Sequence, residues 1–300
     1  MGRKGGFTII ELLVVIAIIA LLLGVLLPAL AGARRNAMSN KDGTQQREIH
    51  RALVLFANSN DGDLPVPGLI NRLPTSFDQD VPGEGPEDFA QNWTGPLFSL
   101  MIAQEFFDTD VLIGPTEINP IVVVDADYLR SKYDPGSDSY WDDAFEVNID
   151  AIPGDNLFCN TSFAHQALCG QRKNRRWRDT QDSTYPIIVT RGVRDGALIG
   201  TPDYDQSQTL RLHGTRKSWV GNVVFADNHW EQLVNFYPTQ TRGKRADGTE
   251  DSRDNIFAAE FGPGGPNEFY PQGPDAWMVI STDADDNGLE VTPDYDRLTP

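Results

Sequence analysis

The sequence predicts an α+β protein in which a long N-terminal membrane-spanning helix packs on an antiparallel β-sheet head. Three observations lead to this fold class. Residues 12–33 form an apolar run without charges, residues 49–56 repeat apolar side chains at helical spacing, and residues 219–234 alternate as two strands around a tight turn. Helices and strands that are segregated along the chain in this way are typical of the α+β class.

The composition allows a large folded head and argues against a nucleic-acid ligand. The chain has 300 residues, of which 40% are hydrophobic and 23% are charged, so it can bury a core. Its net charge is −18, whereas binding to a phosphate backbone requires clustered Lys and Arg. The acidic excess lies mainly in residues 61–160, which hold 20 Asp and Glu against 3 Lys and Arg.

The apolar run is long enough to cross a membrane, and an acidic residue stands at its start. From Leu12 to Ala33 there are 22 residues without a charge, which span about 33 Å as a helix against a bilayer core of about 30 Å. An acidic side chain such as Glu11 costs about 3 kcal/mol inside a membrane helix. We therefore expect Glu11 to have a partner and a function.

An ordered motif precedes this run. Lys4-Gly5-Gly6 is followed by Phe7-Thr8-Ile9-Ile10-Glu11 and then by the apolar residues. This order resembles the N-terminal signal of type IV prepilins and of type II secretion pseudopilins. The resemblance implies that a prepilin peptidase cuts the chain after Gly6 and that the new N-terminal residue, Phe7, is methylated on its amine.

The resemblance also implies roles in assembly for Glu11 and Pro28. In fibres of this family the carboxylate of Glu11 would lie near the N-terminal amine of a neighbouring subunit, which relieves a buried charge and fixes the axial register. Pro28 lacks the N–H of the helical ladder, so we expect a bend around residues 24–28. The implied partners are the prepilin peptidase, other pilin or pseudopilin subunits, inner-membrane lipid and the pilus or secretion assembly platform.

Two alternatives explain an apolar N-terminus without a fibre. One is an ordinary secretory signal peptide with Ala29-Leu30-Ala31 as its cleavage site, followed by a secreted enzyme or binding protein. The other is a plain single-pass anchor. The flanking charges do not settle the orientation, because the basic residues at positions 34–41 outnumber the two before the run. The resemblance to prepilins implies a head in the periplasm or extracytoplasmic space.

A second apolar stripe continues towards the head. Ile49, Ala52, Leu53 and Phe56 are spaced i, i+3, i+4 and i+7, which defines one packing face of a helix. The Asn-Lys-Asp-Gly sequence at residues 40–43 looks like an interruption, because Asp-Gly favours a turn.

These signals predict the domain organisation. We expect helical pieces at residues 7–39 and 44–58, with one continuous helix as the alternative, and a stop at the breaker cluster of residues 58–65. His50 is expected on the helix surface. The complete division is a leader at 1–6, a helix at 7–58 with a membrane and fibre-core part at 7–33 and an amphipathic part at 44–58, and a head at 59–300.

Within the head, the apolar segment at residues 97–102 predicts a short helix. Residues 118–124 and 186–190 predict strands, and residues 219–234 predict a β-hairpin with Asp227-Asn228 at its turn.

The hairpin resembles the C-terminal H-x₉-DG region of prepilin-type proteins, with two departures. Thirteen residues separate His213 from Asp227, and Asn228 stands where the family has glycine. His213, Asp227 and His229 have no serine or cysteine nucleophile associated with them, and turn chemistry explains Asp227, so we expect no catalytic residues.

Cys159 and Cys169 are the only cysteines of the chain. In an oxidising compartment they are expected to form a disulfide, and two free buried thiols are the alternative.

Residues 172–178 hold five basic side chains in seven positions. A solvated loop is the expected structure, and the alternative is a docking edge for the acidic residues 61–160 of an adjacent subunit.

The C-terminal segment contains one metal-site pattern. Asp283, Asp285, Asn287, Leu289 and Asp294 occupy positions 1, 3, 5, 7 and 12 of a segment close to the EF-hand calcium loop. The pattern departs from that loop in having Asp at its last position. Calcium is the one cofactor that the sequence suggests, and a solvated acidic turn is the alternative.

Together these features predict a non-enzymatic structural subunit of a type II secretion pseudopilus or a type IV pilus-like fibre. Before assembly, one helix would hold it in the inner membrane. A minor or tip subunit with an adhesive or ligand-binding head is the alternative, because the head of about 240 residues exceeds what a simple major subunit needs.

Overall fold

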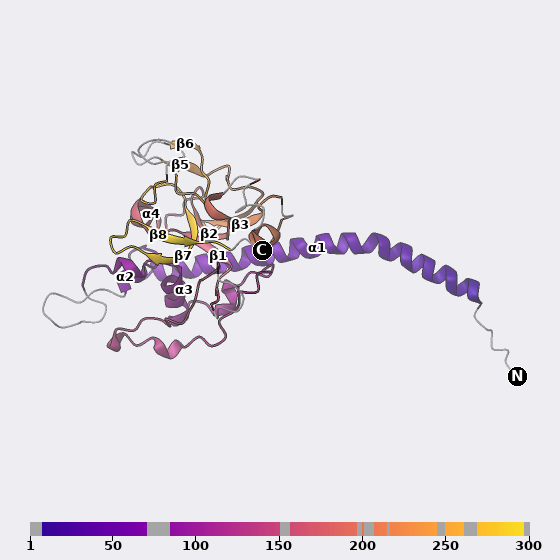
Figure 1. The fold of residues 1–300 in the computed structure, drawn as a ribbon, viewed down its shortest axis with the longest axis horizontal. Helices are drawn as coiled ribbons and strands as arrows, with labels where there is room; N and C mark the ends of the chain where they lie inside the picture. Colours follow the sequence, from indigo (N-terminus) through magenta and orange to yellow (C-terminus); the bar gives the residue numbers. More distant parts are fainter. Residues whose placement is uncertain are drawn as a thin grey trace.

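A long helix projects from an α+β head, and its C-terminal half is embedded in that head (Figure 1). The computed structural model describes residues 8–70, 85–150, 157–196, 200, 207–214, 217–244, 250–260 and 269–296. Within these ranges the predicted fold class, a long N-terminal apolar helix with an antiparallel sheet, is confirmed.

Helix α1 (Ile9–Ala57) runs without interruption for 49 residues. The break predicted at residues 40–43 is wrong, and the continuous alternative is correct. The helix ends at the predicted breaker cluster, where the Asn60 side chain donates to the Phe56 carbonyl at 2.7 Å. Asp61 and Gly62 then take positive φ angles of 53° and 81°, which turn the chain out of the helix.

Pro28 lies inside α1 and does not end it. A proline in a helix interior removes one backbone hydrogen bond and bends the helix. In Figure 1 the projecting part of α1 is curved rather than straight.

The head contains three short α-helices and one main sheet among the described residues. The helices are α2 (Pro67–Ile70), α3 (Thr94–Ala103) and α4 (Gly170–Arg176). The sheet has the order β4-β3-β2-β1-β7-β8, and every neighbouring pair in it is antiparallel. Its strands are β1 (Phe163–Gln166), β2 (Pro186–Thr190), β3 (Gly221–Phe225), β4 (Trp230–Leu233), β7 (Met278–Ala284) and β8 (Val291–Asp294).

The predicted helix at 97–102, the strand at 186–190 and the hairpin at 219–234 are confirmed as α3, β2 and β3–β4. A second hairpin, β5 (Arg242–Lys244) with β6 (Glu250–Arg253), lies at the side of the head furthest from α3 (Figure 1).

The strand predicted at residues 118–124 is wrong. This segment makes one isolated bridge, between Val122 and Cys159. Asn119 turns the chain, because its side-chain oxygen accepts from the Ile121 N–H and its carbonyl accepts from the Val122 N–H. Pro120 follows directly and has no N–H to offer a ladder.

The core joins the C-terminal half of α1 to the sheet. The predicted stripe is its helical side, since Ile49 and Leu53 are fully buried and Ala52 and Phe56 are 6% exposed. They belong to the same apolar cluster as the inward side chains of β2 and β3. This packing fixes α1 across β2, β3 and β4.

A buried polar contact locks α3 onto the sheet. His165 in β1 is 0% exposed, and its Nδ1 lies 2.8 Å from the Gln166 carbonyl, which can only accept. Its Nε2 therefore accepts from the Thr94 hydroxyl at 2.8 Å, while the Thr94 oxygen accepts from the Ser281 N–H. Burial lowers the pKa of His165 from 6.5 to about 4.

Burial of His165 makes one contribution to stability sensitive to acid. At this site the unfolded chain binds more protons than the folded chain between pH 6.5 and 4, so the contribution of His165 to the free energy of unfolding falls as the pH is lowered through that window. Asp275 and Asp294, whose pKa values are raised by burial, contribute in the opposite direction. A His165→Gln variant should lose this histidine contribution, so its change in the free energy of unfolding between pH 6.5 and 4 should differ from that of wild type by about 3 kcal/mol. Urea titrations at several pH values measure it. An unchanged pH dependence in His165→Gln would contradict the assignment.

Candidate functional site

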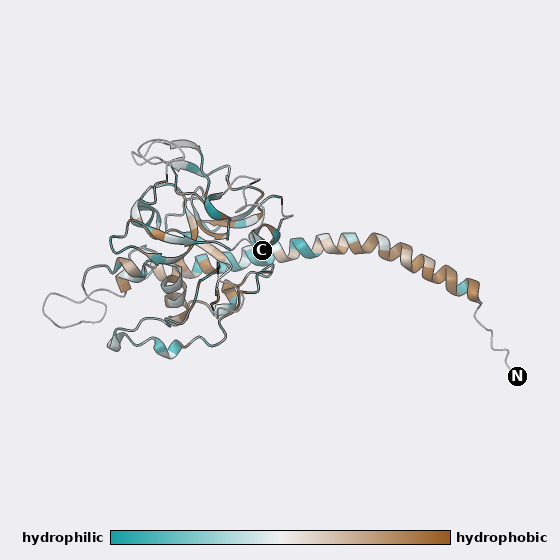
Figure 2. Cartoon of the chain, viewed as in Figure 1, coloured by the Kyte–Doolittle hydropathy of each residue, from teal (hydrophilic) through white to brown (hydrophobic). Residues whose placement is uncertain are grey.

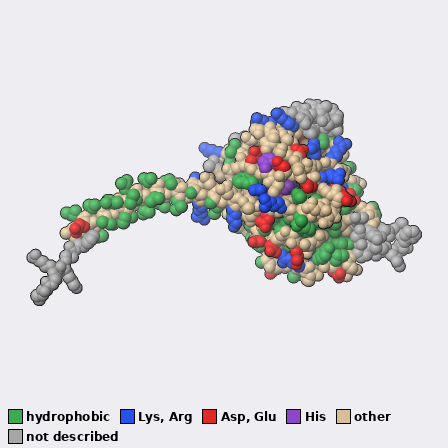
Figure 3. Space-filling model, turned by 180° about the vertical axis from the view of Figure 1, so that it is seen from behind, with side chains coloured by type: hydrophobic (Ala, Val, Ile, Leu, Met, Phe, Trp, Pro, Cys, Tyr) green, Lys and Arg blue, Asp and Glu red, His purple; other side chains and the backbone are tan. Residues whose placement is uncertain are grey.

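Helix α1 has two halves with different surroundings. Its large apolar side chains from Ile9 to Leu30 are 44–83% exposed, whereas the face from Ser39 onwards is buried by the head. It is the one helix among the described residues that is long and apolar enough to span a membrane, and none of its apolar window is buried. Figure 2 colours this half as predominantly hydrophobic, and Figure 3 shows hydrophobic side chains along its surface. A bare apolar surface of this extent is typical of a membrane or assembly interface.

Glu11 lies at the N-terminal end of this exposed apolar surface and caps its own helix. The Glu11 N–H donates to the Thr8 hydroxyl oxygen at 3.2 Å. The Glu11 Oε2 atom accepts from the Thr8 N–H and from the Thr8 hydroxyl, both at 2.8 Å. This reciprocal arrangement is a capping box, and it occupies only one of the two carboxylate oxygens.

A second acidic residue, Asp42, holds the other half of α1 to the head. Its side chain is 1% exposed, and its Oδ2 atom is the common acceptor of four hydrogen-bond donors. The donors are Gln46 Nε2 at 2.9 Å, Asn222 Nδ2 at 2.8 Å, Thr190 Oγ1 at 3.1 Å and His213 Nε2 at 3.2 Å. They come from α1, β3, β2 and the segment before β3, so one carboxylate joins four parts of the molecule. Charge-assisted bonds of this kind offset the cost of burying it.

The neighbours of Asp42 complete the network. Asn222 Nδ2 also donates to the Ser39 carbonyl at 2.8 Å, and Gln46 Nε2 also donates to the Thr190 hydroxyl at 2.9 Å. The Ser39 hydroxyl in turn accepts from Gln232 of β4 at 2.5 Å. The side-chain amides of Asn222 and Gln46 thus each use both of their N–H bonds, which fixes the position of α1 along the strands.

Gly43 explains why the Asp-Gly pair does not break the helix. A Cβ atom at this position would lie 2.7 Å from the Trp230 ring, so only glycine lets the indole of β4 pack directly on the helix backbone. The sequence at residues 40–43 is therefore a contact surface for the head and not a turn.

The hairpin turn contacts α1 through His50. This residue was expected on the surface, but it is 2% exposed and its Nδ1 lies 3.2 Å from Asn228 Oδ1. Burial lowers the pKa of His50, which favours the neutral ring. Asn228 has a φ of 65°, a left-handed conformation that asparagine tolerates, and this accounts for its presence where the resembled family has glycine.

His213, Asp227 and His229 do not form one cluster, because His213 lies apart from the other two. His213 contacts Asp42, whereas Asp227 is hydrogen-bonded to His229 on the hairpin turn. No group of three or more His, Cys, Asp or Glu residues in the described parts of the chain is arranged to hold a metal ion.

The solvated loop expected at residues 172–178 is wrong, because the segment folds as α4 and buries its first charges. Arg172 is 0% exposed and forms an ion pair with Asp275, and Lys173 pairs with Glu87. Burial raises the pKa of Asp275, and the charge of Arg172 offsets only part of this increase, so the pKa is about 7. These two cations hold the head together and are not available to a partner.

The predicted disulfide is wrong in the structure, where both cysteines are free and buried. The Cys159 Sγ donates to the Thr161 carbonyl and the Cys169 Sγ to the Pro271 carbonyl, each at 3.2 Å. The extended strand β1 lies between them and carries the chain about 13 Å along the sheet. The two thiols therefore belong to different apolar clusters. Burial raises their pKa values to about 12 and about 11, so both are protonated.

The predicted calcium loop folds as the β7–β8 hairpin. Asp285 Oδ1 accepts from the N–H groups of Leu289 and Glu290, which closes the turn. Asp294 lies opposite Ile280, away from the turn, and its Oδ2 accepts from the Ile149 N–H at 2.7 Å. Calcium binding by Asp283, Asp285, Asn287, Leu289 and Asp294 stays a prediction to which this arrangement adds no support.

The fold and the two halves of α1 define a type IV pilin-like arrangement: a long N-terminal apolar helix on a six-stranded antiparallel sheet. Residues 1–27 match the family described as the prokaryotic N-terminal methylation motif, so the chain carries a prepilin N-terminus. No curated protein and no solved structure matches the chain. Gly6 and Phe7, the predicted processing residues, fall within the matched range and outside the described residues.

Filling the contact at Gly43 should loosen α1 from the head. A Gly43→Val side chain would collide with the Trp230 ring, and we expect the free energy of unfolding to fall by about 2 kcal/mol. Gly32→Val is the matched control, because nothing lies within 4 Å of a Cβ atom there. Thermal unfolding of the full chain in mild detergent measures both, and equal effects would argue against close packing at Gly43.

Removing the Asp42 carboxylate should be more costly. Asp42→Ala leaves buried donors on four elements without their acceptor, and we expect a loss of about 3 kcal/mol in the free energy of unfolding. Asp42→Asn retains one acceptor oxygen and should lose less. Lys41→Ala changes the adjacent exposed charge and should leave stability within about 0.5 kcal/mol of wild type. An Asp42→Ala protein as stable as Lys41→Ala would refute the anchoring role.

Proposed function

We propose that this protein is a structural subunit of a type IV pilus-like fibre or of a type II secretion pseudopilus. The observation that carries the proposal is the division of one helix. Its N-terminal half follows a prepilin methylation motif and has a bare apolar surface, and its C-terminal half is fastened inside the head. Such a helix has one part for a membrane or a fibre core and one part for positioning the head.

Processing would prepare the N-terminus for assembly. A prepilin peptidase would cut after Gly6 and methylate Phe7, which leaves the new amine next to Thr8 in the sequence. Before assembly, the exposed half of α1 would sit in the inner membrane with the head on the extracytoplasmic side. The chain is then the substrate of processing enzymes and not itself an enzyme.

Assembly would exchange lipid around α1 for the helices of neighbouring subunits. The contacts are heterologous and do not close, so they generate a helical fibre. One carboxylate oxygen of Glu11 lies outside the capping box, and it can accept a hydrogen bond from the N-terminal amine of Phe7 in a neighbouring subunit. This ion pair would set the axial register, because an unpaired charge in the apolar fibre core is costly.

The mature N-terminus tests the proposal directly. N-terminal sequencing with mass spectrometry of protein from the native cell should show a chain that starts at methylated Phe7. A start at Gly32, after Ala29-Leu30-Ala31, would instead identify an ordinary signal peptide and overturn the proposal.

Variants of Glu11 separate its capping role from its charge. Glu11→Gln keeps an acceptor for the Thr8 N–H but has no charge, so we expect normal cleavage and strongly reduced fibre formation, scored by electron microscopy and shear fractionation. Glu11→Ala should behave in the same way. Thr8→Val removes the hydroxyl contacts of the capping box and retains the charge, so its fibres should be normal. Wild-type fibre yield from Glu11→Gln would exclude the ion pair.

A further inference from the structure

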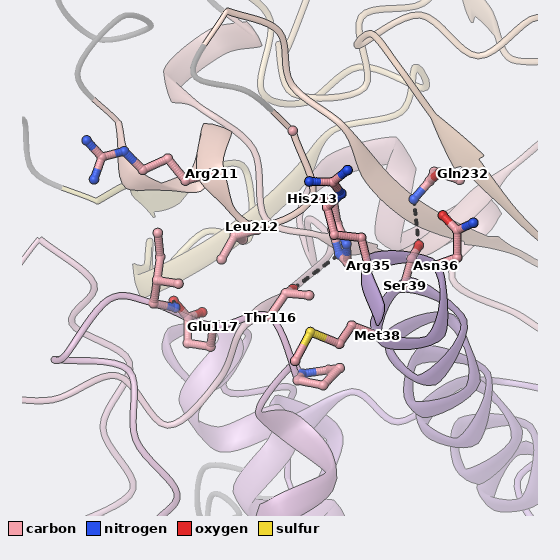
Figure 4. A pocket seen from close by; sticks show the side chains of 13 residues that line it. Arg35, Asn36, Met38, Ser39, Thr116, Glu117, Arg211, Leu212, His213 and Gln232 are labelled. Carbon is pink, nitrogen blue, oxygen red and sulfur yellow. Dashed lines mark hydrogen bonds between the residues drawn. The ribbon is translucent and has the colours of Figure 1, made fainter. Parts of the chain in front are cut away.

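A pocket of about 440 Å³ lies at the point where α1 enters the head. One wall is α1 with Arg35 and Ser39, and the others are the segments around Thr116 and His213 (Figure 4). All three of Arg35, His213 and Arg211 line the pocket; in Figure 4 Arg35 and His213 are drawn close together, and the Arg211 side chain extends away from them. Gln232 of β4 also lines the pocket, which is thus built by four chain segments and includes His213, one of the donors to Asp42.

The charges of this pocket favour an anion. The guanidinium groups of Arg35 and Arg211 make no ion pair or hydrogen bond with any described residue, whereas the acidic groups nearby are already engaged. Glu117 accepts from Arg191 Nη2 at 3.0 Å, and Asp42 Oδ2 accepts from four donors. Burial alone would raise the pKa of Glu117, but Arg191 lowers it below the ordinary value, so this ion pair is stable.

The position of the pocket points to the membrane surface. The uncharged run ends at Ala33, and Arg35 follows two residues later, about 3 Å along the helix axis. A run that fills the hydrocarbon core places Arg35 in the adjoining headgroup layer. Figure 3 shows Lys and Arg side chains gathered where the helix meets the head.

We propose that this pocket binds the phosphate of an anionic phospholipid headgroup in the extracytoplasmic leaflet. Arg35 donates to the phosphate oxygens, and Arg211 adds a second positive charge. The bound lipid would seat the head on the bilayer while the subunit waits for extraction. This inference rests on the membrane-inserted stage of the proposed function and not on fibre assembly.

The experiment uses the full chain in a neutral maltoside detergent at the physiological ionic strength of about 0.15 M. Dihexanoylphosphatidylglycerol, dihexanoylphosphatidylcholine and glycerol 3-phosphate are titrated separately, and the thermal-unfolding midpoint reports binding. The anionic lipid should raise the midpoint, and the other two should not. Arg35→Gln should weaken the response about tenfold, and Arg211→Gln should weaken it less.

Arg34→Gln is the matched control, because it removes the same charge one residue away and Arg34 does not line the pocket. It should respond as wild type does. If Arg34→Gln loses the midpoint shift as Arg35→Gln does, the lipid is held by unspecific charge attraction. If glycerol 3-phosphate raises the midpoint as much as the anionic lipid does, the pocket is a site for soluble phosphates. If the anionic lipid does not raise the midpoint of the wild-type protein, the pocket does not bind it. Each of these three results overturns the inference. None depends on methylated Phe7, so its failure is distinguishable from failure of the proposed function.

Discussion

One buried carboxylate, that of Asp42, determines how the helix and the head are joined. An ionised group at 1% exposure is stable only when donors surround it, and here they come from four parts of the chain. Apolar packing around Ile49 and Leu53 supplies most of the contact but permits sliding, because it is not directional. The hydrogen bonds to Asp42 are directional, so they select one register of α1 on the sheet.

This register has a functional consequence. With Asp42 fixed on β2 and β3, residues before 38 project from the head, and they carry the bare apolar surface that a membrane or a fibre core would cover. Glu11 lies at one end of this surface and the arginines at positions 34 and 35 lie at the other. The same helix can then serve both environments, because only its partners change and its attachment to the head does not.

Local patterns in the sequence predicted the helices and strands. The features that they did not predict depend on contacts between residues far apart in the chain. The spacing of Ile49 to Phe56 and the alternation around Asp227-Asn228 depend on neighbours in the chain, and α1 and the β3–β4 hairpin follow them. Asp42 looked like part of a turn because its partners lie 148, 171 and 180 residues away. The same limitation applies to Arg172, whose acidic partner is 103 residues away, and to His50, which meets Asn228 across 178 residues. Composition reported their charge, and only the fold shows that they are buried.

A double-mutant cycle between Asp42 and Asn222 tests the anchoring most directly. Free energies of unfolding would be measured for wild type, Asp42→Ala, Asn222→Ala and the double variant, all as the full chain in the same detergent. If the 2.8 Å bond between the two side chains helps to hold α1 on β3, the coupling energy should be at least about 1 kcal/mol. Additivity within about 0.3 kcal/mol would contradict the account, because it would mean that the two residues stabilise the protein independently.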